Sequence, residues 1–138
     1  MWDEAAYIEI SKSIEATTIC RVKCDNCNTW EIQFVDNSRL EILGLWRLID
    51  DDNLCSTSED HEKVFYLERQ FDGIKALSEL VGLKIVKCKI LESTGDIDIE
   101  FEDQFILQII STSAGNDNWK YYSLNGKIFI AKGYSIFV

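Results

Sequence analysis

Two stretches of this sequence read as copies of one β-hairpin: WEIQFVDNSRLEIL at residues 30–43 and IDIEFEDQFILQII at residues 97–110. In both, apolar and polar residues alternate on either side of a polar turn, as in half-buried strands. At a constant offset, Ile32, Phe34, Asp36, Leu40 and Ile42 fall on Ile99, Phe101, Asp103, Leu107 and Ile109. The sequence therefore predicts two related β-units within one chain.

A tryptophan followed by a cation comes after each hairpin, as Trp46-Arg47 in the first unit and Trp119-Lys120 in the second. We interpret both tryptophans as core residues, because a ligand platform would seldom be needed at equivalent positions of both copies. The alternative is an apolar pocket near Trp46 and Trp119, which would make the protein a small-molecule-binding or sensory domain.

Two amphipathic helices are predicted outside the hairpins. In the segment 2–14, apolar residues recur every four positions, which favours an N-terminal helix. A second helix at about 72–82 would link the β-units, with Asp72 as its N-cap and Gly82 at its left-handed end.

The expected fold class is α+β, with two antiparallel β-meanders joined by a central helix and preceded by an N-terminal one. The meanders are predicted over residues 18–56 and 84–138. The chain has 138 residues, of which 46% are hydrophobic, and this suffices for one core, so we expect a single domain over 1–138. The pattern leaves open whether the two units form one sheet or two.

The charge balance limits the partners of the chain. Its 24 acidic and 14 basic residues give a formal net charge of −10. Such a surface repels phosphate backbones and anionic lipids, so we expect no nucleic acid and no membrane partner, but a basic protein. The first residues lack an export signal and no window has the length of a membrane span, so the expected location is cytoplasmic.

Two groups of carboxylates are the candidate partner-binding residues. The first occupies alternate positions of a predicted strand, about 6.5 to 7 Å apart, where like charges repel until a cationic partner neutralises them. The second lies in an acidic segment that runs from Asp50 to Glu62, and ordinary solubilising surface is the alternative interpretation of both. The first candidates are Asp96, Asp98, Glu100 and Glu102, and the second are Asp50, Asp51, Asp52 and Asp60.

Catalytic and metal-binding patterns are weak. Cys20, Cys24 and Cys27 have the spacing of thiolates that hold an iron-sulfur cluster, but the chain is too short for the barrel that such enzymes need, and we interpret them as ordinary thiols, with Cys20 and Cys24 in the core. The single histidine, His61, lies among carboxylates and is interpreted as a solvated loop residue. We expect no metal, no cofactor and no enzymatic activity. An enzyme with an unfamiliar carboxylate pair inside a cleft is the other alternative.

Four motifs carry a resemblance to a known class of proteins: GLWRL at 44–48, LVGLKI at 80–85, GDIDIEFED at 95–103 and NWK at 118–120. With these motifs the chain resembles the immunity proteins encoded beside bacterial polymorphic or contact-dependent toxins. The resemblance implies a small, acidic, cytoplasmic protein that binds and neutralises the toxin domain of its own locus. It assigns no site residue, because these families diverge where they touch the toxin.

Overall fold

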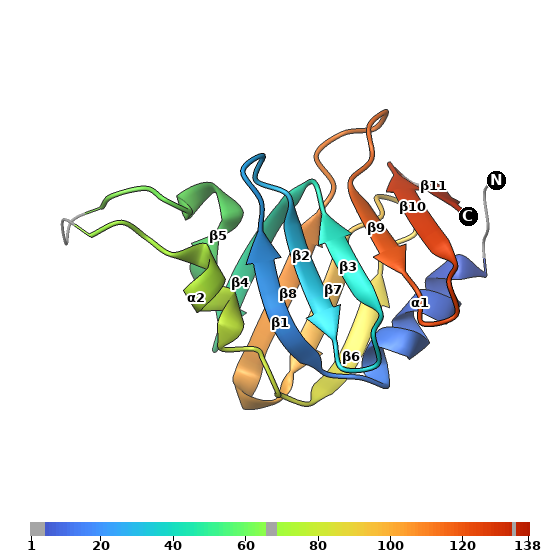
Figure 1. The fold of residues 1–138 in the computed structure, drawn as a ribbon, viewed down its shortest axis with the longest axis horizontal. Coiled ribbons are helices and arrows are strands. Elements are labelled where there is room, and N and C mark those ends of the chain that lie inside the picture. Colours follow the sequence, from blue (N-terminus) through green and yellow to red (C-terminus); the bar gives the residue numbers. More distant parts are fainter. Residues whose placement is uncertain (1–4, 66–68, 134) are drawn as a thin grey trace.

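The computed structural model describes residues 5–65, 69–133 and 135–138 and confirms the α+β fold, with two antiparallel sheets and two helices (Figure 1). The helices are α1 (Ala6–Glu15) and the short α2 (Gly73–Ser78). One sheet has six strands in the order β1-β2-β3-β9-β10-β11, and the other has five in the order β5-β4-β8-β7-β6. None of the helices in the described part of the chain is long and apolar enough to cross a membrane.

Each sheet takes strands from both repeats, which answers the question that the sequence left open. In the six-stranded sheet the strands are β1 (Ile19–Cys24), β2 (Trp30–Phe34), β3 (Arg39–Ile42), β9 (Trp119–Tyr122), β10 (Ile128–Lys132) and β11 (Ser135–Phe137). In the five-stranded sheet they are β4 (Leu45–Asp50), β5 (Asn53–Thr57), β6 (Ile85–Ile90), β7 (Ile97–Phe101) and β8 (Phe105–Ile110). Each repeat thus builds a three-stranded meander in one sheet and then crosses to the other sheet.

Each helix also packs against a strand of the other repeat. Helix α1 precedes the first meander but packs on β6 of the second repeat, and α2 precedes the second meander but packs on β1 of the first. In Figure 1 the two helices stand at opposite sides of the sheets. The fold is therefore two interlocked copies of a helix-meander unit, related by an approximate twofold.

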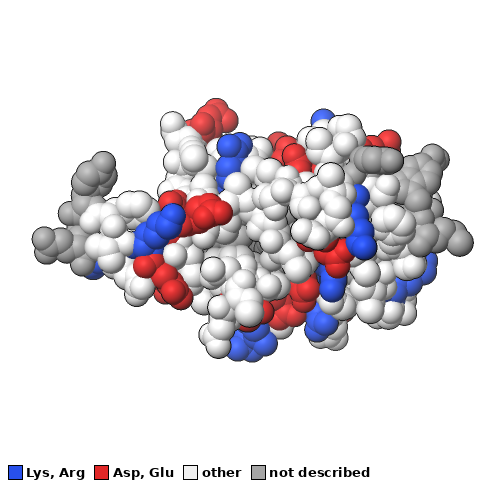
Figure 2. Space-filling view, turned by 90° about the horizontal axis from the view of Figure 1, so that it is seen from above, with Lys and Arg blue, Asp and Glu red and all other residues white. Residues whose placement is uncertain are grey.

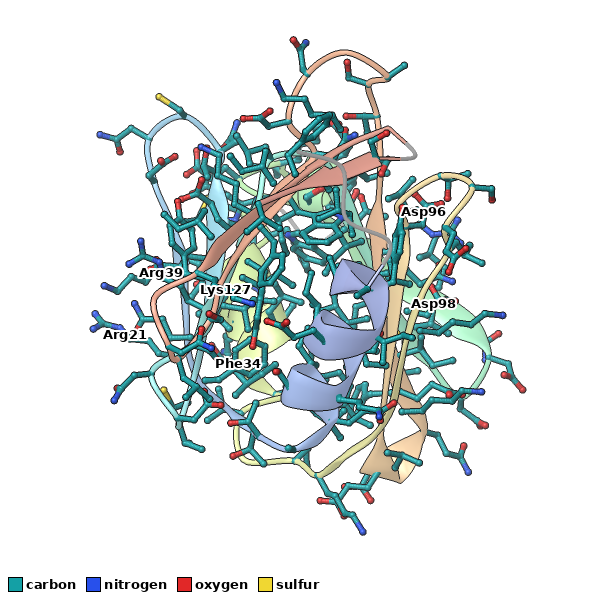
Figure 3. All side chains as sticks on the ribbon, turned by 90° about the vertical axis from the view of Figure 1, so that its right-hand side faces the viewer. Arg21, Phe34, Arg39, Asp96, Asp98 and Lys127 are labelled. Carbon is teal, nitrogen blue, oxygen red and sulfur yellow. The ribbon has the colours of Figure 1, made fainter. Side chains whose placement is uncertain are left out.

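The core lies between the sheets and contains the apolar residues shared by the two hairpins. Phe34 and Phe101 are 2% and 4% exposed, and Figure 3 shows Phe34 between the sheets. Trp46 and Trp119 have no exposed surface, which confirms that both are core residues. The Trp119 indole N–H donates a hydrogen bond to the carbonyl oxygen of Gly95 at 2.7 Å.

The linking helix is shorter than the predicted segment 72–82. The Asp72 cap is confirmed, since its carboxylate accepts hydrogen bonds from the N–H groups of Ile74 and Lys75. After Ser78 the chain continues in turns, and the N–H of Gly82, which has a φ of +80°, donates to the carbonyl of Ile19 on β1. This docking onto the sheet replaces the last helical turn. Helix α1 ends one residue later than predicted, and residues 2–4 of its predicted start lie outside the described residues.

Of the two thiols predicted in the core, Cys20 is exposed, contrary to the prediction, and Cys24 is half-buried against the core. All five cysteines lie in the described part of the chain, where Cys88 is buried, Cys24 is half-buried, and Cys20, Cys27 and Cys55 are exposed. Cys20 turns outward because a bulge interrupts the β1–β2 register between Ile19 and Arg21. The second repeat has the same bulge on β6, between Ile85 and Lys87.

Candidate functional site

The outer face of the five-stranded sheet carries the first group of predicted carboxylates. Strand β7 lies between β6 and β8, and Figure 3 shows Asp98 on the side of this sheet that faces away from α1. On β6, Lys89 lies opposite Asp98 and Lys87 lies opposite Glu100. The carboxylates on the strand therefore have cations beside them on one side.

The two ends of the predicted row have structural roles. The Asp96 carboxylate accepts a hydrogen bond from the N–H of Ser111 at 2.7 Å, and the Glu102 carboxylate accepts one from the N–H of Lys84 at 3.0 Å. Glu102 already lies beyond β7, which ends at Phe101, in the 3₁₀ turn Glu102–Gln104. Of the four predicted carboxylates, only the inner pair, Asp98 and Glu100, belongs to the strand itself.

The surroundings of Asp98 perturb its titration. Burial raises the pKa of Asp98, and repulsion from Asp96 and Glu100 raises it further, against the lowering effects of a hydrogen bond from Gln108 and of the Lys89 charge. Gln108 is itself held by Arg47, whose guanidinium donates to the Gln108 side-chain oxygen at 2.6 and 3.0 Å. The ionised form of Asp98 is thus less favourable in the fold than in water.

Replacement of this carboxylate should therefore stabilise the free protein. Because its folded pKa is raised above the unfolded value, protonated Asp98 contributes stability that is lost as pH rises through the folded pKa. We expect Asp98→Asn to be more stable than wild type at pH 7 and to lose this advantage by about pH 3, where the carboxyl is mostly protonated in both states. Urea unfolding at both pH values measures this, with the exposed Glu59→Gln as control. A destabilised Asp98→Asn at pH 7 would refute the assignment.

The second group of carboxylates meets the first at one end of the sheet. Asp51 and Asp52 form the β4–β5 turn, and the Asp51 N–H donates to the carbonyl of Gln104 in the β7–β8 turn at 3.2 Å. Both turn residues have positive φ, 50° and 66°, which aspartate tolerates better than most residues. The two turns therefore lie side by side, although they are far apart in the sequence.

Between these turns is a hollow of about 300 Å³, which we call the acidic hollow. Its lining combines carboxylates from both predicted groups with aromatic and aliphatic side chains, and no lysine or arginine of the described residues lines it. The lining residues are Asp51, Asp52, Glu100, Phe101, Gln104, Phe105 and Ile106. Such a lining fits a basic side chain, because the carboxylates pair with its charge while the phenyl ring of Phe105 and the side chain of Ile106 contact its carbon stem.

The remaining candidates lie outside the acidic hollow. Asp50 is at the end of β4, opposite Phe105. Asp60 belongs to the 3₁₀ helix Ser58–Asp60, where its carboxylate accepts a hydrogen bond from the N–H of Thr57 at 3.0 Å in a capping box. The structure thus brings together Asp51, Asp52 and Glu100, but gives Asp60 a capping role elsewhere.

His61 is not the solvated loop residue that the sequence predicted. Its side chain is 11% exposed, and its ring lies 4.9 Å from that of Trp30 in an edge arrangement. The imidazole Nδ1 accepts a hydrogen bond from the N–H of Gly73 at 3.0 Å, and Nε2 lies 3.4 Å from a Glu62 carboxylate oxygen. No sequence pattern marked this role, because the contact joins a loop to the start of a helix twelve residues away.

The sequence also raised a metal site and a ligand pocket near Trp46 and Trp119 as alternatives. Within the described residues, no group of three or more His, Cys, Asp or Glu side chains is arranged to hold a metal ion. Neither Trp46 nor Trp119 lines the acidic hollow. Comparisons with family models, with curated proteins and with solved structures each find no match.

Proposed function

We propose that this chain is a non-enzymatic immunity protein that binds a basic toxin domain in the cytoplasm and neutralises it. The observation that carries the proposal is the acidic hollow, at which Asp51, Asp52 and Glu100 converge on a protein of net charge −10. A lysine or arginine of the partner would enter the hollow and replace repulsion among carboxylates by attraction.

The surroundings of the hollow supply the other parts of a protein interface. On the outer face of the same sheet, Ile49 of β4 lies between Ile106 of β8 and Leu54 of β5, and Leu54 is 58% exposed. Apolar residues beside a charged anchor are typical of the centre of an interface, where water is excluded. The raised pKa of Asp98 reflects an unfavourable negative charge, and a cationic partner would stabilise this charge as well.

The negative charge of the chain also fits a nuclease as the toxin. A nuclease presents a cationic cleft to the phosphates of its substrate, and a rigid group of carboxylates competes for the same cleft. The charge has a kinetic effect too, because attraction between unlike surfaces speeds association at low ionic strength.

The gene neighbourhood and a protection assay test this function. We expect the neighbouring gene to encode a large secreted protein, and its C-terminal domain to stop growth of a host unless this chain is produced with it. A variant that neutralises the hollow, Asp51→Asn/Asp52→Asn/Glu100→Gln, should protect less well, since asparagine keeps the left-handed turn while removing the charge. A neighbourhood without such a gene, or toxicity that the chain leaves unchanged, would contradict the proposal.

A further inference from the structure

A second pocket lies at the other end of the fold, between the β1–β2 turn and the residues 61–62 and 70–74. Its volume is about 600 Å³, within the range of small-ligand sites. Figure 2 views the molecule from this end and shows acidic side chains in small groups rather than in one continuous field. We call this second pocket the polar pocket. The residues that line it are Cys24, Asp25, Asn26, Asn28, His61, Glu62, Gln70, Phe71, Asp72 and Ile74.

The duplication supplies an internal comparison for this pocket. Asn28 and Gly95 are equivalent turn residues, and both have positive φ, 59° and 80°. In the second repeat the backbone at Gly133 covers the turn, since a Cβ on Gly95 would lie 2.6 Å from the carbonyl oxygen of Gly133. In the first repeat the equivalent turn borders the polar pocket instead. The space is therefore a property of the first repeat and not of the fold itself.

The lining sets the chemistry of a ligand. Among the described residues it contains three carboxylates, those of Asp25, Glu62 and Asp72, and no lysine or arginine. One oxygen of Asp25 accepts hydrogen bonds from the N–H groups of Cys27 and Thr29, and one oxygen of Asp72 caps α2. These bonds fix both carboxylates before a ligand arrives, so that little side-chain entropy is lost on binding.

The spacing of these carboxylates selects among cations. The three carboxylates come from three segments, which are the β1–β2 turn, the residues after the 3₁₀ helix Ser58–Asp60, and the N-cap of α2. No described group of three His, Cys, Asp or Glu side chains could hold a metal ion. An extended organic cation matches this spread, because its charged end reaches a carboxylate while its carbon chain lies on Phe71 and Ile74. We propose that the polar pocket binds an amine or guanidinium group carried on an aliphatic chain.

This chemistry has two sources, a free polyamine and a basic side chain of another protein. Spermidine represents the first, and the blocked peptides Gly-Lys-Gly and Gly-Arg-Gly represent the second. Titration of the full chain with each probe, followed by ¹H–¹⁵N NMR, reports binding at individual groups.

The Trp46 indole is the reporter signal beside the pocket. Its N–H has no hydrogen-bond partner in the described part of the chain, and its Cζ2 lies 3.2 Å from where a Cβ at Gly73 would be, beside His61. The Trp119 indole, bonded to Gly95, is the matched control signal.

We expect saturable shifts of the Asn26, Asn28, Glu62 and Gly73 amides and of the Trp46 indole, with the turn 92–95 and Trp119 unmoved. Glu62→Gln should weaken binding about tenfold, the effect of losing one charged hydrogen bond. The exposed Glu59→Gln outside the pocket should leave binding unchanged.

Tighter binding of spermidine than of the peptides identifies a free polyamine as the ligand, and the reverse identifies a side chain. Absence of saturable shifts with all three probes, or equal binding by Glu62→Gln and wild type, overturns the proposal. The result does not depend on the acidic hollow.

Discussion

Phe34→Ala and Phe101→Ala should each lower the free energy of unfolding by about 3 to 5 kcal/mol. The two phenyl rings are equivalent members of the duplicated hairpins and are 2% and 4% exposed. Truncation leaves a cavity between the sheets, and the close-packed core around it relaxes only partly to fill the space. Urea unfolding of the two variants and the wild type measures the loss.

Surface valines are the controls for this experiment. Val35 and Val86 are both 61% exposed, so Val35→Ala and Val86→Ala should change stability by at most about 0.5 kcal/mol. Similar losses for both phenylalanines would support the equivalence of the repeats. A loss below about 1 kcal/mol in either would mean that the assigned strand faces are wrong.

Gly95→Ala should cost about 2 to 5 kcal/mol, the sum of a strained left-handed backbone and of overpacking. Gly95 has a φ of +80°, and a Cβ there would lie 2.6 Å from the Gly133 carbonyl oxygen. The movement needed to relieve this contact would also disturb the hydrogen bond from Trp119 to the Gly95 carbonyl.

Gly82→Ala separates the two contributions. Gly82 has the same φ of +80°, but a Cβ there would meet nothing within 4 Å. Its cost should therefore be the backbone strain alone, about 1 to 2 kcal/mol. Equal losses for Gly95→Ala and Gly82→Ala, from thermal or urea unfolding, would show that the second repeat does not close its turn as described.

The strands and the duplication could be predicted because their signal is local. Alternation of apolar residues in 30–43 and 97–110 marks the buried face of each strand, and burial of Phe34 and Phe101 agrees with it. The exchange between repeats could not be predicted, because the pairing of β3 with β9 depends on contacts between residues far apart in the sequence. Outward rotation of Cys20 also escaped prediction, since a single-residue bulge breaks the alternation on which the argument relied.

The candidate site was predictable in its composition but not in its shape. Sequence alone identified Glu100 in one group and Asp51 with Asp52 in another. It could not join them, because the acidic hollow arises from two turns that meet only when β4 pairs with β8. Equally, the polar pocket depends on His61 contacting Gly73, a contact without a periodic signature.

Isothermal titration calorimetry of the chain with the toxin domain that we propose is encoded beside it tests the central claim most directly. Three forms are compared at low and high salt: the wild type, Asp51→Asn/Asp52→Asn/Glu100→Gln, and the control Glu59→Gln/Glu79→Gln/Glu92→Gln, which removes three exposed charges outside the acidic hollow. We predict that the Kd of the hollow variant rises at least about tenfold at low salt and that this difference shrinks as salt is added, while the control stays within about twofold of wild type. Equal Kd values for all three forms would contradict the claim that the acidic hollow binds the partner.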